Sequence, residues 1–234
     1  MKWLLTLLIF LITTQISFSQ VTLFAGITYG GAIPDTSVSN STGSPGIGFN
    51  TGLAYTFRLN EKFTLQPELH YHSRNFTYES SLRKDTVVEV EFGGSTTQIP
   101  TFYTARVHGN TYTHNLDVSA MATWRIGKYF SLTAGPYGSF AFAGRDAVQV
   151  VVTIGEGGVV DDIIQNEEHW ADINRFETGL KLGGIFHFND KFSLRIIGLR
   201  AFTRFYQQNY ISGDNGQPVS FYHTMLLAGV SYQF

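Results

Sequence analysis

The feature of this sequence that most constrains its fold is a strict alternation of apolar residues with small or polar ones. In the segment 46–59 the odd positions are mainly apolar, as at Ile47, Phe49 and Leu53, whereas the even positions hold glycine, asparagine, alanine, threonine and arginine. A period of two indicates a β-strand with one apolar face, because a helix requires a period of about 3.6. Six further segments alternate similarly, and they cover residues 21–29, 63–74, 115–126, 130–144, 176–188 and 222–234.

An eighth segment, residues 192–207, alternates with a change of phase. Its apolar positions are even-numbered up to Ile196 and odd-numbered from Leu199 onward. One extra residue in a strand produces such a shift, and glycine is common at these β-bulges. The sequence therefore predicts a β-bulge near Gly198.

The connections between these segments alternate between very short and long. The short ones are residues 60–62, 127–129 and 189–191, and the long ones are 30–45, 75–114, 145–175 and 208–221. This layout is typical of outer-membrane β-barrels, whose periplasmic turns are tight and whose extracellular loops are long. We therefore expect an all-β fold, a transmembrane antiparallel up-and-down β-barrel of eight strands with long extracellular loops and both chain ends in the periplasm.

The short turns share a sequence repeat. Each is followed by one version of the same pattern, Phe63-Thr64-Leu65, Phe130-Ser131-Leu132 or Phe192-Ser193-Leu194. Aromatic residues on both sides of the turns predict a girdle at one membrane interface, with members Phe57, Phe63, Trp124, Phe130, Phe188, Phe192 and Tyr232. The final Phe234, preceded by alternating apolar positions, predicts the signal by which the barrel-assembly machinery recognises its substrates.

Two other folds remain open at the level of sequence. A soluble β-sandwich also alternates, although it does not need exposed aromatic residues at a common level. A ten-stranded barrel results if the hairpin expected over residues 88–107 joins the wall, but its turn at Gly93 lacks the Phe-containing pattern. This hairpin, together with the strand-like residues 148–154 and the acidic stretch 161–168, could extend the wall outward, form a platform for a partner or be ordinary surface loops.

The N-terminal region predicts export. A short positive region precedes an apolar run, residues 3–12, that is too short to span a membrane as a helix. We expect residues 1–19 to be a cleaved signal peptide and residues 20–234 to form a single outer-membrane β-barrel domain. The sequence has no cysteine, which excludes a disulfide framework and a lipid-modified cysteine anchor.

Composition agrees with strands that face lipid. Charged residues make up 15% of the chain, against about 25% in typical soluble domains, and aromatic residues also make up 15%. The formal net charge is −2, and it becomes −3 when Lys2 is removed with the signal peptide. Because this leaves no basic field, nucleic acid is not expected as a partner.

Three motifs carry a resemblance to a known family. They are Leu65-Gln66-Pro67-Glu68-Leu69, Ala134-Gly135-Pro136-Tyr137 and Thr178-Gly179-Leu180-Lys181-Leu182-Gly183-Gly184. In these motifs the chain resembles the PorT-like outer-membrane β-barrel proteins, which share the form of the small OmpA/OmpX-type barrels, and the resemblance covers nearly the whole mature chain. Residues 115–118 depart from the apolar, proline-containing start that is common in the fourth strand of the family. The resemblance implies a bacterial outer-membrane location and a small barrel, rather than one particular activity.

If the apolar faces contact lipid, the opposite faces carry charge into the barrel. The candidates for a polar network in the lumen are Glu68, His70, His72, Arg74, Asp117, Glu177, Lys181 and Arg195, with Gln66, Arg125 and His187 on the same faces. Eight strands enclose room only for side chains, so we expect these residues to fill the lumen with ion pairs and hydrogen bonds. A narrow water-filled path is the alternative.

Two other interpretations involve chemistry at the histidines. His70 and His72 share one face of a strand beside Glu68, a spacing that could suit two metal ligands. His70, His72, His114 or His223 could instead form an acid/base set with Asp117. Neither pattern fixes a nucleophile or a full ligand set, so no catalytic residue, metal or cofactor is expected.

The sequence favours a non-enzymatic barrel that acts as a structural or protein-binding subunit of a larger outer-membrane secretion, assembly or uptake complex. The expected partners are outer-membrane lipid and lipopolysaccharide, the barrel-assembly machinery during biogenesis, and other outer-membrane proteins. A small pore or transporter is the first alternative, and a membrane-embedded hydrolase or acyltransferase is the second.

Overall fold

The computed structural model describes residues 20–34, 41–92, 95–156, 159–168, 174–212 and 218–234, and these form an all-β chain. Its strands are β1 (Val21–Pro34), β2 (Ser41–Tyr55), β3 (Phe57–Arg58), β4 (Phe63–Phe92), β5 (Ser95–Arg125), β6 (Phe130–Glu156), β7 (Val159–Glu168), β8 (Phe176–His187), β9 (Phe192–Ala201), β10 (Tyr206–Ser212) and β11 (Pro218–Gln233). Within these ranges no helix is long and apolar enough to cross a membrane. The predicted signal peptide, residues 1–19, lies outside the described residues and stays a prediction.

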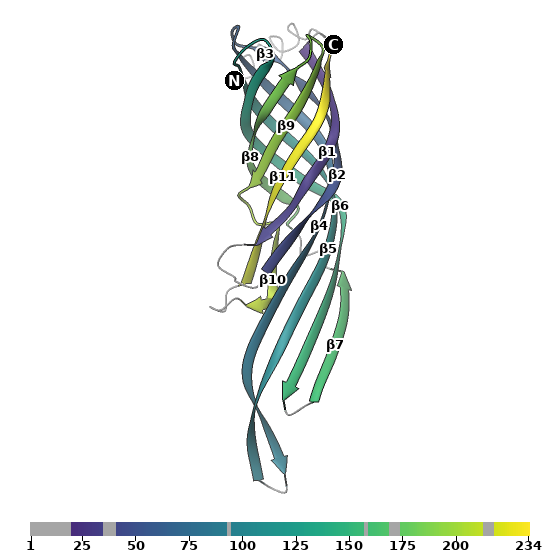
Figure 1. Ribbon diagram of the computed structural model, residues 1–234, viewed down its shortest axis with the longest axis vertical. Coiled ribbons are helices and arrows are strands. Elements are labelled where there is room, and N and C mark those ends of the chain that lie inside the picture. The colour runs from purple at the N-terminus through teal and green to yellow at the C-terminus, as the bar shows by residue number, and fades with distance from the viewer. Residues whose placement is uncertain (1–19, 35–40, 93–94, 157–158, 169–173, 213–217) are drawn as a thin grey trace, which may run out of the picture.

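Eight of the strands form a closed ring (Figure 1). They pair antiparallel in the order β1-β2-β4-β5-β6-β8-β9-β11, and β11 pairs back with β1 from Gln233 to Phe221. The other strands do not enlarge the ring. β3 follows β2 in the chain and, like β2, pairs with β4, whereas β7 pairs with β6 and β10 pairs with β11. The predicted eight-stranded up-and-down barrel is confirmed, and the ten-stranded alternative is wrong.

Asparagine side chains hold two of the three short turns. The Asn60 oxygen accepts hydrogen bonds from the backbone N–H groups two and three residues later, both 2.9 Å long. The Asn189 oxygen accepts the two equivalent bonds, both 2.8 Å long. Asparagine suits tight turns because its side chain can take the place of a backbone acceptor. The described chain begins and ends at this same end of the ring (Figure 1).

The strands β4, β5 and β6 continue far beyond the opposite end of the ring (Figure 1). β4 and β5 stay paired from Phe63↔Trp124 to Phe92↔Ser95, β6 pairs with β5 as far as Gly155, and β7 adds to β6. We call this extension the projecting sheet, and it comprises residues 81–92, 95–106, 147–156 and 159–168.

The projecting sheet confirms the predicted hairpin and its outward extension of the wall. The predicted boundaries were wrong, however, because much of the supposed loops 75–114 and 145–175 is strand. The sequence signal fades there for a physical reason. Beyond the lipid neither face of a strand needs to be apolar, so strand pairing continues without strict alternation.

Exposed and buried side chains alternate along the ring strands. In β8 the exposed positions include Phe176, Leu180 and Leu182, while the buried positions include Glu177 and Lys181. Apolar side chains therefore point away from the interior and charged ones point into it, the reverse of a soluble domain. The soluble β-sandwich is excluded by this arrangement together with the closed ring.

The β-bulge predicted at Gly198 is wrong. β9 pairs with β8 and with β11 without a register shift on either side. Leu199 and Ala201 instead point inward and are 2% and 1% exposed. The interior accepts them because it is packed with side chains, and one apolar cluster there consists of Tyr137, Ile197, Leu199, Met225 and Leu227.

Candidate functional site

The interior of the ring contains the polar residues that the sequence predicted for it. All eight are 5% exposed or less, and they are Glu68, His70, His72, Arg74, Asp117, Glu177, Lys181 and Arg195. They come from β4, β5, β8 and β9, because every second residue of a ring strand points into the lumen. They form three connected ion-pair groups.

The first group joins Glu68 of β4 to Arg195 of β9. These strands lie four places apart in the ring of eight, so the ion pair crosses the full lumen. The other carboxylate oxygen of Glu68 contacts His70 Nε2 at 2.8 Å. The Arg195 guanidinium also lies 4.7 Å from the centroid of the Phe24 ring, a favourable cation–π distance.

The second group is centred on Asp117 of β5. Its carboxylate lies 3.0 Å from His72 Nε2 and 3.4 Å from Lys181 Nζ on β8. Lys181 also donates a 3.4 Å hydrogen bond to the hydroxyl of Ser119, and that hydroxyl donates a 3.3 Å bond to Glu68. The serine therefore connects the second group to the first.

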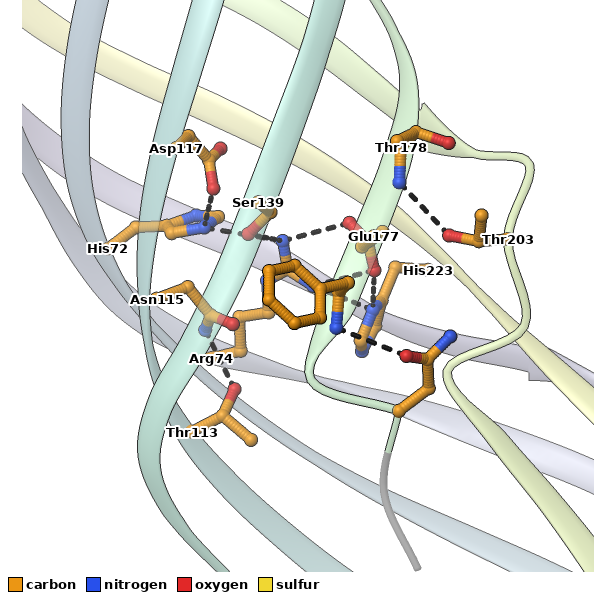
Figure 2. Close-up of polar contacts among 12 residues, drawn as sticks. His72, Arg74, Thr113, Asn115, Asp117, Ser139, Glu177, Thr178, Thr203 and His223 are labelled. Carbon is orange, nitrogen blue, oxygen red and sulfur yellow. Dashed lines mark hydrogen bonds and ion pairs between the residues drawn. The ribbon is translucent and has the colours of Figure 1, made fainter.

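The third group is centred on Glu177 of β8 (Figure 2). The two terminal nitrogens of Arg74 donate to its two oxygens at 2.9 and 3.0 Å, and the Tyr137 hydroxyl donates to one of them at 2.7 Å. His223 Nδ1 on β11 makes a further close contact with the carboxylate. Arg74 also approaches His72 Nε2 at 3.3 Å, which connects the third group to the second.

Charge is balanced within these groups. Three carboxylates, Glu68, Asp117 and Glu177, face three cations, Arg74, Lys181 and Arg195. Balance is needed because an unpaired charge in a lumen of low dielectric is costly, and each charge here has an opposite partner. The groups therefore bridge the ring from within and fill its middle with side chains.

The sequence prediction did not include Tyr137 or Ser119 in these groups, and it considered His223 only as an acid/base candidate with Asp117. Tyr137 and His223 both engage Glu177, and Ser119 links two groups. A sequence signal was nevertheless present. Like the lumen-facing residues of its own strand, each of these three residues has an odd residue number, which places it on the inward face. Odd or even numbering could not show which residues of distant strands meet, because those contacts depend on how the strands are staggered around the ring.

A neutral layer lies between the ion pairs and the short turns. Gln66 donates to Thr56 at 3.0 Å, and Thr123 donates to Gln66 at 3.2 Å. His187 contacts the hydroxyls of two serines on neighbouring strands at 2.9 and 3.0 Å. Arg125 lies at the exposed short-turn end of the barrel, where it lines a cavity with His187 and donates to the backbone carbonyls of the adjacent turn.

An aromatic layer covers the ion pairs at the opposite end of the lumen. Phe205 lies in the connection after β9 and packs against His223 and Phe76 with ring centroids 4.1 and 5.4 Å apart. Tyr78 packs against Phe221 at 5.1 Å. All four aromatic residues are 4% exposed or less. The charged groups are thus shielded from the side of the projecting sheet.

The structure forms one of the predicted acid/base pairs, His72 with Asp117, but it does not bring His70 and His72 to one shared site. His70 contacts Glu68 whereas His72 contacts Asp117, so the two imidazoles serve different carboxylates. His114 instead lies 2.5 Å from the Tyr71 hydroxyl, and His223 pairs with Glu177. In the part of the chain that the structure describes, no three or more His, Cys, Asp or Glu side chains are placed to hold a metal ion.

Comparison with known families identifies the broader relationship. Residues 14–207 match the family of the outer membrane protein beta-barrel domain. The chain belongs to this family. It is therefore a bacterial outer-membrane protein, and its apolar outer wall is the surface that contacts lipid. A comparison with curated proteins found no match.

Several solved structures are similar to this chain at low sequence identity. Ail of Yersinia pestis, solved with the heparin analogue sucrose octasulfate, is 12% identical with a TM-score of 0.43, and the match covers 92% of this chain and 97% of Ail. Neisserial surface protein A is also 12% identical, with a TM-score of 0.41 and the same two coverages. OprG of Pseudomonas aeruginosa is 11% identical, with a TM-score of 0.34 over 92% of this chain and 95% of OprG.

The outer wall of the barrel carries the predicted aromatic residues near the short turns. Phe63, Trp124, Phe130, Phe188 and Phe192 are between 40% and 56% exposed, while Phe57 and Tyr232 are partly exposed. Ring contacts join neighbouring strands, with Phe63 stacked on Trp124 at 6.1 Å and Phe192 against Tyr232 at 5.0 Å. The C-terminal Phe234 packs against Tyr232 at 5.1 Å, and its role as an assembly signal stays a prediction.

Proposed function

We propose that this outer-membrane β-barrel is a non-enzymatic anchor that presents its projecting sheet to other proteins of the cell envelope, as a subunit of a secretion, assembly or uptake complex. One observation carries the proposal. The strands β4, β5 and β6 stay paired well beyond a ring whose interior is crossed by ion pairs. A filled lumen offers little room for transport, whereas a sheet with open edges can bind a partner by strand addition.

Orientation and biogenesis are part of the same proposal. The short turns and both chain ends face the periplasm, and the projecting sheet faces outward, as the asymmetry of connection lengths favours. The barrel-assembly machinery inserts the chain, with Phe234 in the recognised C-terminal strand. Within the family, the PorT-like group is the subgroup that the motifs around Pro67 and Pro136 favour.

The experiment is co-purification with and without the tip of the projecting sheet. Residues 83–104 are replaced by Asn-Gly, a two-residue hairpin turn that follows the pair Leu82↔Ala105. Gentle detergent extraction of the unaltered protein should yield a multi-protein complex, whereas the shortened protein should be extracted alone. Replacement of Glu61 by Gln, in a short turn at the other end, is the matched control and should retain the complex.

Two results contradict this function. The unaltered protein could purify as a lone monomer from native membranes, or the shortened protein could retain every partner. Heat-dependent mobility on gels separates a lost partner from a misfolded barrel, because folded barrels migrate differently from unfolded ones.

A small pore is the second candidate, and one observation favours it. A cavity of about 420 Å³ opens at the short-turn end of the barrel, and Arg58, Arg125, Lys128 and His187 are among its lining residues. A pore predicts discrete conductance steps when the purified protein is reconstituted in planar bilayers. A silent bilayer, with protein insertion verified independently, removes this candidate.

A further inference from the structure

A groove runs along the outer wall of the barrel near the end that carries the projecting sheet. Its volume is about 460 Å³, within the range of small-molecule sites, and its lining is mainly apolar. Tyr29, Ile33 and Leu226 line it, and they are between 43% and 50% exposed on the lipid side. Glycines are among its lining residues, and one of them, Gly198, has an outward position on β9.

Gly198 can accept a side chain without disturbing the wall. A Cβ atom at this position meets only the Leu182 carbonyl oxygen, at 3.6 Å, which is an ordinary contact. Other glycines of the wall leave no room for a side chain. A Cβ atom on Gly179, for example, would lie 2.1 Å from the Arg200 carbonyl oxygen of the neighbouring strand. The groove at Gly198 is therefore free space on the lipid side of the wall.

Arg200 stands beside this groove. It is two residues from Gly198 on the same exposed face of β9, and it donates a hydrogen bond to Thr224, which itself lines the groove. Its guanidinium lies 5.9 Å from the centroid of the Tyr222 ring. Among the residues that the structure describes, no carboxylate forms an ion pair with Arg200.

The depth of Arg200 in the membrane suits an interfacial charge. It lies eight residues along β9 from Phe192, about 26 Å of strand or about 20 Å of height at a tilt of about 40°. The apolar band of such barrels is about 25 Å tall, so Arg200 lies near its upper edge. An outward cation there is adjacent to the phosphates of the surrounding lipid.

We propose that Arg200 and the groove form a binding site for lipid A, the phosphate-bearing anchor of lipopolysaccharide, with an acyl chain in the groove and a phosphate on the guanidinium. Lipid is favoured over a protein partner because the groove lies within the lipid-facing wall, between exposed apolar side chains. Charge complementarity favours an anionic lipid, since no carboxylate of the described residues forms an ion pair with Arg200 and guanidinium pairs strongly with phosphate. The site rests on the proposed orientation, in which this end of the barrel meets the outer leaflet, but it does not require a protein bound to the projecting sheet.

Native mass spectrometry of the full-length mature barrel tests the site, with diphosphoryl hexa-acyl lipid A as the titrated probe. One lipid A should bind per barrel more tightly than phosphatidylcholine. Replacement of Arg200 by Gln should weaken lipid A binding about tenfold, as expected for loss of one charge-assisted contact. Replacement of Gly198 by Phe should also weaken it, because the ring fills the groove.

Gly138 provides the matched control. It lies on β6, and a Cβ atom there meets no atom within 4 Å, so Gly138→Phe adds the same ring to a different part of the wall. This variant should bind lipid A as the unaltered protein does. The proposal is overturned if Gly198→Phe and Arg200→Gln bind like Gly138→Phe, or if phosphatidylcholine binds as tightly as lipid A. Should Arg200→Gln fail to fold, Gly198→Phe alone decides whether the groove is occupied.

Discussion

The strand β4 belongs to two regions of the molecule that are stabilised in different ways. Up to Ser80 it pairs with both β2 and β5, and its inward side chains meet partners from across the lumen. Beyond Ser80, within the described residues, it pairs with β5 alone. The same strand therefore passes from a closed ring with a filled interior into a sheet with an open edge.

This difference separates stability from binding. The ring has no free edge, and its buried charges depend on one another, so changes there should affect folding. The projecting sheet has backbone groups available at its edges, so changes there should affect partners. Four predictions test this division, and they involve the buried ion pairs, the aromatic layer, the outer girdle and the tip of the projecting sheet.

Replacement of Glu177 by Ala should have the largest effect. It leaves Arg74 buried without a counter-ion, and loss of one partner from a buried ion pair typically costs about 3 to 5 kcal/mol. The free energy of unfolding, measured by urea titration of the barrel in lipid vesicles, should fall by about that amount. The double variant Glu177→Leu with Arg74→Met should be more stable than the single variant, because it removes both charges. A double variant less stable than Glu177→Ala would contradict the ion-pair explanation.

Replacement of Phe205 by Ala should have the next largest effect. It removes the ring that packs on His223 and Phe76, and buried Phe-to-Ala changes cost about 3 kcal/mol or more. The same titration measures this loss. Planar bilayers containing the variant should remain silent, since the ion-pair groups still fill the lumen. New conductance would show instead that the aromatic layer alone blocks the lumen.

Replacement of Trp124 by Ala should have a smaller effect. Trp124 lies on the outer face and stacks on Phe63, and such aromatic pairs contribute about 1 kcal/mol beyond area burial. The unfolding midpoint should shift slightly while the folded barrel keeps its gel mobility. Val118→Ala, at another outward position of the same strand, serves as the control for lost apolar area. A loss as large as that of Glu177→Ala would show that the outer wall contributes as much as the interior.

The Asn-Gly replacement of residues 83–104 should have the smallest effect on stability. The removed residues form no part of the closed ring, and shortening a connection between paired strands changes the closure entropy only slightly. The unfolding free energy should therefore change by less than about 1 kcal/mol, as for surface changes generally. A large loss of stability would show that the ring depends on its extension.

Much of the ring could be predicted because lipid imposes a simple rule on each strand. Outward side chains must be apolar, and this rule revealed the strands, the short turns and the eight buried polar residues. The rule failed at Leu199 and Ala201, which are apolar and yet point inward. The polarity of a residue indicates its direction only where the lumen is polar, and one side of this lumen holds an apolar cluster instead.

Two further features were outside the reach of single-strand patterns. The pairing of Glu68 with Arg195 and of Glu177 with His223 joins residues more than 40 positions apart, and it depends on the stagger of the strands. The projecting sheet was underestimated because strands outside lipid lose their strict alternation. Its hairpin turn was still visible in the sequence, since glycine at positions 93 and 94 separates two strand-like segments.

The sequence by itself determined the class of this outer-membrane β-barrel, because alternation and connection length are local properties that one strand or turn expresses alone. The tertiary structure decided which inward residues meet, how the lumen is closed by ion pairs and aromatic rings, and how far the wall extends. It also placed Arg200 beside a glycine-lined groove on the lipid side, since the groove is formed by strands from both ends of the chain. These features depend on ring closure and strand stagger, which no segment of the chain specifies alone.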